Sequence, residues 1–185
     1  MVIADSGVRR SLAKTEYNQR RADCEKAMEL LRIYLPDIQS LRDVSLTQFE
    51  EFANTFPEVI RKRARHVIEE IDRVQKASVC LMREDAQGFG QLMVEGHQSL
   101  RDLYQVSIPE LDALVEIAIE IEGCFGSRLT GAGFGGCTVS LVKKGLADNF
   151  TKVLKEKYLI QTGKQADAYI CQPSRSVFVE KISVC

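Results

Sequence analysis

Residues 125–142 read Phe125-Gly126-Ser127-Arg128-Leu129-Thr130-Gly131-Ala132-Gly133-Phe134-Gly135-Gly136-Cys137-Thr138-Val139-Ser140-Leu141-Val142. Strand-forming residues flank a turn in which four of the chain's twelve glycines fall between Gly131 and Gly136. The turn is too short for a crossover connection, so we predict that strands 125–130 and 137–142 are antiparallel neighbours in one sheet.

This glycine turn has two interpretations. Backbone N–H groups in a turn with few side chains can converge on an anion, and glycines let phosphate oxygens approach closely, which favours a phosphate-binding loop. A β-hairpin whose connection needs positive φ would show the same composition. The spacing alone leaves both interpretations open.

Three known glycine motifs do not fit the turn. The spacing Gly131-x-Gly133-x-x-Gly136 matches the dinucleotide fingerprint, but the alternating, β-branched segment 137–142 follows it, where that motif needs a helix. No Gly-Lys-Ser/Thr closes the turn, which excludes a Walker A loop. The chain also lacks the His-Arg-Asp and Asp-Phe-Gly motifs of protein kinases.

Length and charge limit the class of protein. The chain has 185 residues, and no linker rich in Pro, Gly or Ser interrupts it, so we expect one domain over residues 1–185. Its 25 basic and 26 acidic residues give a net charge of −1, which argues against nucleic acid or an anionic membrane as a partner. Without an apolar run near membrane-spanning length, we expect a cytoplasmic protein.

The cysteines are scattered singly along the chain. Six cysteines without a Cys-x-x-Cys pair, and two histidines far apart, predict neither a zinc site nor a disulfide framework. We therefore expect reduced, mostly buried thiols and no metal ligands in this chain.

Helical periodicity dominates the chain from Thr15 to about Gly123. We expect a first helix capped by Thr15 and ending before Pro36, with an outer face formed by Arg20, Arg21, Asp23, Glu25 and Lys26. Further helices are predicted over about 47–54 and 57–83, and from Asp85 and Ser107 or Ile108 onward.

Strand patterns surround this helical region. Residues 2–4 read as the end of a strand, and beyond the glycine turn we expect a helix over 146–158 and strands over 166–171 and 176–181. Helices packed on one face of a mainly antiparallel sheet give an α+β fold.

A few other side chains are candidates for a site. Tyr17 at the start of the first helix suits one face of a sugar, although taken alone it reads as ordinary packing. Arg9 and Arg10 follow the first strand and could reach phosphate or solvent. For His97 we expect a structural role. The basic run at residues 61–66 reads as a solvated face, with Glu69 and Glu70 one turn later as partners for Arg65 and His66.

Taken together, these stretches resemble the C-terminal half of the galactokinases, within the GHMP family of small-molecule kinases. Residues 126–139 are similar to the third GHMP motif in its galactokinase form. Residues 11–21 are similar to the segment that supplies a tyrosine to galactose in that family. Residues 97–102 and 109–116 are similar to the two helical stretches that precede the third motif. Asp5 and Arg10 depart from the pattern, which has Asn and His there.

The resemblance implies a fold, an activity and a site. The fold would be the ferredoxin-like split β-α-β arrangement of a GHMP kinase C-terminal domain. The activity would be ATP-dependent phosphorylation of α-D-galactose at O1. Tyr17 would contact the sugar, the backbone of Gly131, Ala132, Gly133, Phe134, Gly135 and Gly136 would line the phosphate end, and Arg9 could contact phosphate.

The resemblance also implies an incomplete site. The catalytic residues, the nucleotide loop and the Mg²⁺ ligands would belong to an N-terminal domain that this chain lacks, so we expect no catalytic residue here and no turnover by the isolated chain. Galactose, ATP and that domain would be the partners. The alternatives are a galactokinase-like sugar sensor without catalysis, or another GHMP small-molecule kinase.

Overall fold

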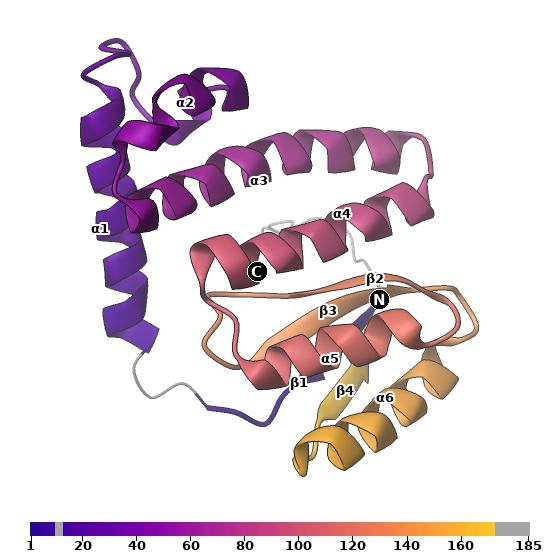
Figure 1. Cartoon of the computed structure of the whole chain (residues 1–185). Helices are drawn as coiled ribbons and strands as arrows, with labels where there is room; N and C mark the ends of the chain where they lie inside the picture. The colour runs from indigo at the N-terminus through magenta and orange to yellow at the C-terminus, as the bar shows by residue number, and fades with distance from the viewer. Residues whose placement is uncertain (10–12, 173–185) are drawn as a thin grey trace, which may run out of the picture.

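The computed structural model describes residues 1–9 and 13–172, and it combines a four-stranded sheet with six α-helices (Figure 1). The strands are β1 (Val2–Asp5), β2 (Cys124–Leu129), β3 (Cys137–Val142) and β4 (Asp167–Ile170). The helices are α1 (Ala13–Leu31), α2 (Leu46–Phe52), α3 (Glu58–Met82), α4 (Ala86–Ser99), α5 (Pro109–Glu120) and α6 (Ala147–Thr162). The predicted α+β class is confirmed.

The sheet has the strand order β2-β3-β1-β4, and all of its pairs are antiparallel. Strands β2 and β3 are joined by the glycine turn and pair in register from Leu129 opposite Thr138, as the short connection predicted. Because side chains alternate along β3, Thr138, Ser140 and Val142 are buried while the residues between them are only half-buried.

Helices α5 and α6 cover one face of the sheet and enclose its core. Fully buried side chains from both helices, among them Leu114, Phe150, Leu154 and Tyr158, pack on Val2 and Ala4 of β1. Pro109 occupies the first turn of α5, and Leu111, Leu114, Val115 and Ala118 of this helix are buried. This core fixes the sheet that carries the glycine turn.

Helix α4 runs along the edge strand β2 with almost no space between the two backbones. A Cβ on Gly90 would lie 2.0 Å from the carbonyl oxygen of Phe125, and one on Gly126 would lie 2.0 Å from that of Gly90. Asp85 caps the helix as predicted, because its side chain accepts a hydrogen bond from the Gly88 N–H. Two glycines therefore set the distance between α4 and the sheet.

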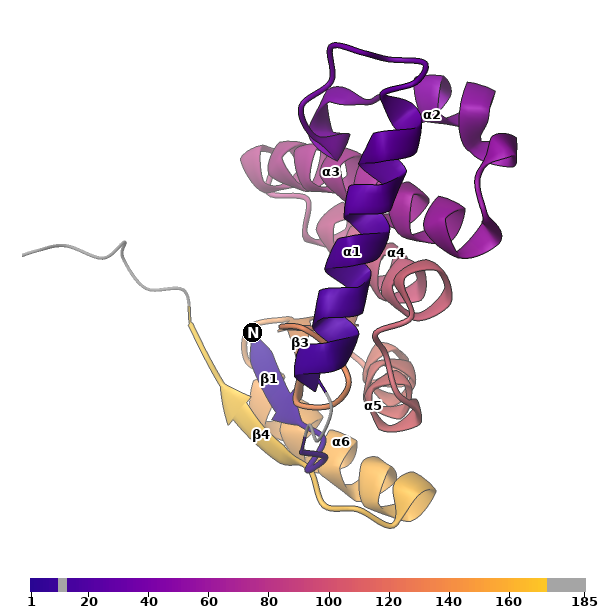
Figure 2. The same cartoon turned by 90° about the vertical axis from the view of Figure 1, so that its left-hand side faces the viewer.

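A second core lies among α1, α2 and α3, away from the sheet. Ala27 and Leu31 of α1 meet Phe49 of α2 and the stripe of α3 that contains Ala64 and Ile68. In Figure 2, α1 runs from this helical layer toward the level of the sheet. Helix α1 thus spans the two layers of the molecule.

Several sequence predictions are wrong in detail. Thr15 lies inside α1, which already begins at Ala13, so it does not cap the helix. Arg20 and Asp23, placed on the outer face, are buried, as are Arg63 and His66 of the run read as a solvated face. Each of the four has buried polar partners, described below. The cysteines expected to be buried are half-buried thiols at Cys24, Cys80, Cys124 and Cys171.

The strand predicted over 176–181 and the residue Arg10 lie outside the described residues. None of the described helices combines the length and the apolar character that crossing a bilayer requires.

Candidate functional site

The glycine turn is held open by backbone conformations that glycine favours. The φ angles of Gly131, Gly133, Gly135 and Gly136 lie between 79° and 122°, and Phe134 also has a positive φ of 58°. Gly133 and Gly135 are buried against neighbouring backbone, whereas Gly131 is exposed at the tip and Ala132 is half-buried. A Cβ on Gly133 would lie 2.1 Å from the Val106 carbonyl oxygen.

Two of the six amides in the turn already have protein partners. The Phe134 N–H donates to the Val106 carbonyl at 2.7 Å, and the Gly136 N–H donates to the Val8 carbonyl at 3.2 Å. In the described part of the chain, no protein acceptor is bound to the N–H groups of Gly131 and Ala132. The surface that could meet an anion is therefore the tip of the turn.

Tyr17 and Arg9 are both exposed. The Tyr17 side chain projects from the second turn of α1 with 56% of its surface exposed. Arg9 is 88% exposed, and its guanidinium lies 3.7 Å from the Asp5 carboxylate. An exposed tyrosine offers an apolar ring face and a hydroxyl, which is the combination that a sugar ring and its hydroxyl groups require.

Arg20, one turn after Tyr17, connects α1 to the glycine turn. Its Nε donates to the Tyr104 carbonyl at 2.8 Å and its Nη2 to the Gln105 carbonyl at 2.9 Å. Its guanidinium carbon lies 5.6 Å from the centre of the Phe134 ring, within the range of a cation–π contact. The candidate sugar-binding and phosphate-binding elements are thus joined through one buried side chain.

A second arginine, Arg63 of α3, completes this buried cluster. It donates to the Leu103 carbonyl and, at 2.7 Å, to the side-chain oxygen of Gln105. Its Nε lies 3.6 Å from the Asp23 carboxylate, which supplies the compensating negative charge. The two arginines together bind three successive carbonyls of residues 103–105, where a short π-helix (η3, Leu100–Tyr104) ends.

His66 and Tyr104 pack beside these arginines. The two rings stack with centroids 4.5 Å apart, and His66 Nδ1 lies 2.8 Å from the Ser99 hydroxyl. Burial lowers the pKa of His66 to about 4, so the imidazole is neutral at neutral pH. Burial also raises the pKa of Tyr104, which keeps its hydroxyl protonated.

His97 fixes the strand that leads into the turn. Its Nδ1 accepts the Leu129 N–H at 3.3 Å, so its Nε2 carries the proton and donates to Asp112 Oδ1 at 3.0 Å. The Ser107 hydroxyl donates to the same oxygen at 2.5 Å. Burial would raise the pKa of Asp112, but the two hydrogen bonds outweigh it and hold that pKa below its usual value. Since these contacts join α4, α5 and β2, His97 has the predicted structural role.

Comparison with known proteins assigns this arrangement to a family. Residues 77–160 match the family model "GHMP kinases C terminal". The galactokinase of Roseiflexus sp. (strain RS-1) is 46% identical over 96% of this chain, and the Homo sapiens galactokinase is 44% identical over 93% of it. The structure of Lactococcus lactis galactokinase complexed with galactose superposes with a TM-score of 0.84 at 36% identity, over 91% of this chain.

The chain belongs to the galactokinase family. It spans 45% of the Roseiflexus protein, 42% of the human protein and 43% of the Lactococcus chain, which is less than half of each. The Leishmania (L. major) mevalonate kinase in complex with R-mevalonate has a TM-score of 0.52 at 22% identity, which shows a common fold alone. The family model that matches residues 77–160 describes the C-terminal part of the GHMP kinases.

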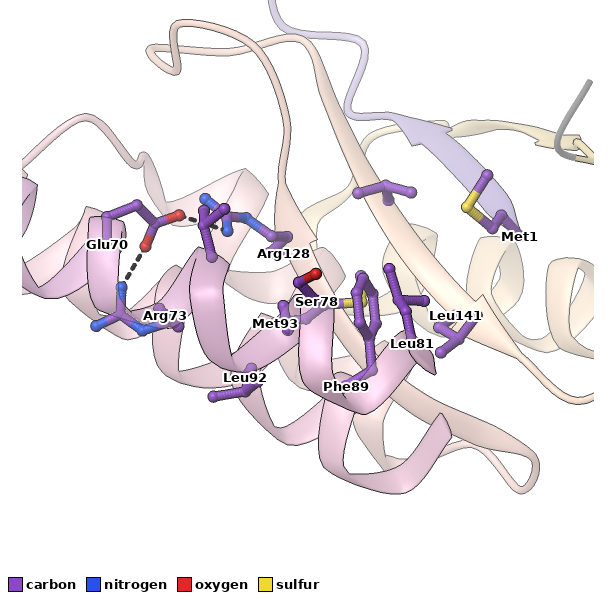
Figure 3. A pocket seen from close by; sticks show the side chains of 13 residues that line it. Met1, Glu70, Arg73, Ser78, Leu81, Phe89, Leu92, Met93, Arg128 and Leu141 are labelled. Carbon is purple, nitrogen blue, oxygen red and sulfur yellow. Dashed lines mark hydrogen bonds and ion pairs between the residues drawn. The ribbon is translucent and has the colours of Figure 1, made fainter. Parts of the chain in front are cut away.

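An apolar groove lies apart from Tyr17 and the glycine turn, neither of which is among its lining residues. It has a volume of about 460 Å³ and runs between α3, α4 and the sheet, lined by apolar side chains such as Phe89, Leu92 and Leu141 (Figure 3). At one end, Glu70 accepts hydrogen bonds from Arg73 and, at 2.7 Å, from Arg128. These two arginines are already paired, so the groove offers an anion no free cation among its lining residues.

No group of three or more metal-binding side chains gathers within residues 1–9 and 13–172 of the galactokinase domain.

The buried cluster around Arg20 was hard to predict from the sequence. Its one local signal is spacing: Arg20 and Asp23 lie on the same stripe of α1 as Ala27 and Leu31, which are fully buried. Because Arg20 and Asp23 are polar, they were predicted to be exposed. Their spacing from Ala27 and Leu31 would instead have placed them on the buried face of α1.

Proposed function

We propose that this chain is the C-terminal domain of an ATP-dependent galactokinase, which transfers a phosphoryl group to O1 of α-D-galactose and yields galactose 1-phosphate and ADP. The observation that carries the proposal is the likeness, over nine-tenths of this chain, to a galactokinase solved with galactose. The N-terminal domain, ATP and galactose would be the partners, and the cytoplasm the location.

The residues of this chain would bind and position the two substrates. Tyr17 would place its exposed ring against the sugar, and the amides at the tip of the glycine turn, those of Gly131 and Ala132, would donate to phosphate oxygens. The positive φ values of the turn support this use, because they keep backbone N–H groups clear of side chains. Phosphoryl transfer depends mostly on positioning and charge stabilisation, so these contacts would contribute directly to the rate.

Magnesium would accompany ATP in this reaction, and no group of three or more His, Cys, Asp or Glu side chains gathers within the described residues. Its ligands would come from the additional half that the relatives possess. For the same reason we propose that the isolated chain has no turnover: a halved site cannot align the sugar, the nucleotide and the metal.

A hybrid enzyme tests the proposal. This chain would replace the matching 45% of the Roseiflexus galactokinase, and phosphorylation of galactose would be followed by ADP release. We expect Tyr17→Phe to raise KM for galactose about 10-fold, as the loss of a hydrogen bond worth roughly 1.4 kcal/mol would. Tyr34→Phe is the matched control, because Tyr34 is also exposed but stacks on Phe52, away from the site. Equal KM values for the two variants would refute the role of Tyr17.

A further inference from the structure

Arg20 makes its contacts with two elements that are far from α1 in the sequence. The side chain is 8% exposed, although arginine normally lies at the surface. Two of its nitrogens donate to the consecutive carbonyls of Tyr104 and Gln105, and its guanidinium faces the ring of Phe134. A displacement of the guanidinium would therefore disturb the hydrogen bonds at the end of η3 and the contact with Phe134 in the glycine turn.

The carbonyls that bind Arg20 belong to the same segment that binds the turn. Gln105 has a φ of 54°, and the next residue, Val106, accepts the Phe134 N–H at 2.7 Å. Arg63 holds the Gln105 side chain at 2.7 Å, which stabilises this left-handed conformation. Residues 104–106 therefore form a bridge with Arg20 on one side and Phe134 on the other.

Tyr17 lies at the Arg20 side of this bridge. It precedes Arg20 by three residues, so the two side chains are neighbours on one face of α1. Glu16, the residue before Tyr17, pairs with Arg20 at 3.5 Å. A displacement of Arg20 would therefore reach Tyr17 through this turn of α1.

We propose that Arg20 is a positioning residue that keeps Tyr17 in a fixed placement relative to Phe134 and the glycine turn. The assignment of Tyr17 to the sugar and of the glycine turn to phosphate rests on the proposed function. The contacts that link Tyr17 to the turn through Arg20 do not depend on that assignment. Lysine cannot replace arginine here, because it lacks the planar fork that binds two carbonyls while facing an aromatic ring.

A double-mutant cycle on this chain tests the connection without any assay of activity. The five tyrosines would be labelled with 3-fluorotyrosine, and the Tyr17 signal in the ¹⁹F spectrum assigned by its loss in Tyr17→Phe. Phe134→Leu removes the ring that faces Arg20, and we expect it to shift the Tyr17 signal. In the Arg20→Lys background the same Phe134 substitution should no longer shift it.

Arg21 provides a matched control for the Arg20 substitution. Arg21→Lys alters the neighbouring arginine, which is exposed and pairs with Glu25 at 2.9 Å, and should leave the Tyr17 shift and its response to Phe134→Leu unchanged. The proposal is overturned if Phe134→Leu leaves Tyr17 unmoved, or moves it equally in both backgrounds. If Arg20→Lys unfolds the chain, all five signals collapse, and a Tyr17 signal that Phe134→Leu leaves unmoved in the parent chain still overturns the proposal.

The hybrid enzyme then separates this inference from the proposed function. In an active hybrid, Arg20→Lys should reduce kcat/KM for galactose roughly 100-fold, as small misplacements of substrate-positioning groups do, with changes in both kcat and KM. Arg21→Lys should match the parent. Unchanged kinetics in Arg20→Lys would overturn the positioning role while leaving the activity intact. A hybrid inactive before any substitution would instead count against the proposed function, and the ¹⁹F cycle would still decide the connection.

Discussion

His97 and Asp112 form a buried hydrogen bond of 3.0 Å between α4 and α5, and the opposite nitrogen of His97 holds the N–H of Leu129, two residues before the glycine turn. The imidazole therefore has both nitrogens committed, one as donor and one as acceptor. Its side chain is 3% exposed, so water cannot replace either bond. The position of the turn depends on this pair.

We expect His97→Ala to destabilise the chain by about 2–3 kcal/mol, because it leaves the Leu129 N–H without its acceptor and removes one of the two donors to the Asp112 carboxylate. Gln98→Ala is the control, since Gln98 is exposed on the same helix and its loss should cost less than about 0.5 kcal/mol. Urea unfolding followed by circular dichroism measures both. Similar midpoints for the two variants would show that the His97 contacts carry no net stability.

Gly133 and Gly145 allow a direct test of crowding in the glycine turn. Both have positive φ, 79° and 89°, but a Cβ on Gly133 would meet the Val106 carbonyl at 2.1 Å while one on Gly145 meets nothing within 4 Å. Gly145→Ala should cost about 1 kcal/mol from φ alone. Gly133→Ala should cost a further 1–3 kcal/mol, roughly the penalty of overpacking. A smaller loss for Gly133→Ala than for Gly145→Ala in denaturant unfolding would contradict the packing described.

Thr138 offers a substitution that should stabilise the protein. It is fully buried, and its hydroxyl has no hydrogen-bond partner among the described residues. Thr138→Val should therefore raise the free energy of unfolding by about 1 kcal/mol, by removing an unsatisfied polar atom. Ser140→Ala on the same strand should lower it, because the Ser140 hydroxyl donates to Ser127 at 2.9 Å. A loss of stability in Thr138→Val would refute this reading of the Thr138 environment.

The pH dependence of stability follows from His66. Its pKa is lowered from 6.5 to about 4 by burial, despite the opposing charge of Glu70. The unfolded chain binds the His66 proton more readily than the folded chain does. The free energy of unfolding therefore carries no penalty from His66 above pH 6.5 and decreases as the pH drops from 6.5 toward 4. The loss is on the order of 3 kcal/mol.

His66→Gln removes this titrating group, so the slope of stability against pH between 4 and 6.5 should flatten. Chemical unfolding at several pH values measures it. An unchanged slope in His66→Gln would place the pH dependence elsewhere.

The sequence predicted most of the fold because its strongest patterns are local. The Asp85 cap and the alternation of 137–142 each require only neighbouring residues, and the structure has them where they were expected. The start of α1 was misjudged, because Thr15 is a good cap but the helix continues back to Ala13.

The candidate site was less predictable because its contacts are long-range. The carbonyls that bind Arg20 lie more than 80 residues away, and the Arg63 partners lie about 40 residues away. No local pattern indicates such partners, so polar residues that are buried among them look like surface residues. The residue types pointed to the glycine turn and to Tyr17, the resemblance to a family assigned their roles, and the link between them came from the structure.

The most direct test of the central claim is the product formed by the hybrid of this chain with the remaining part of the Roseiflexus galactokinase, supplied with ATP and galactose. The account predicts ADP release and galactose 1-phosphate, identified by ³¹P NMR, from the hybrid and no turnover from this chain alone. A folded hybrid that releases no ADP with galactose, or turnover by the isolated chain, would contradict it.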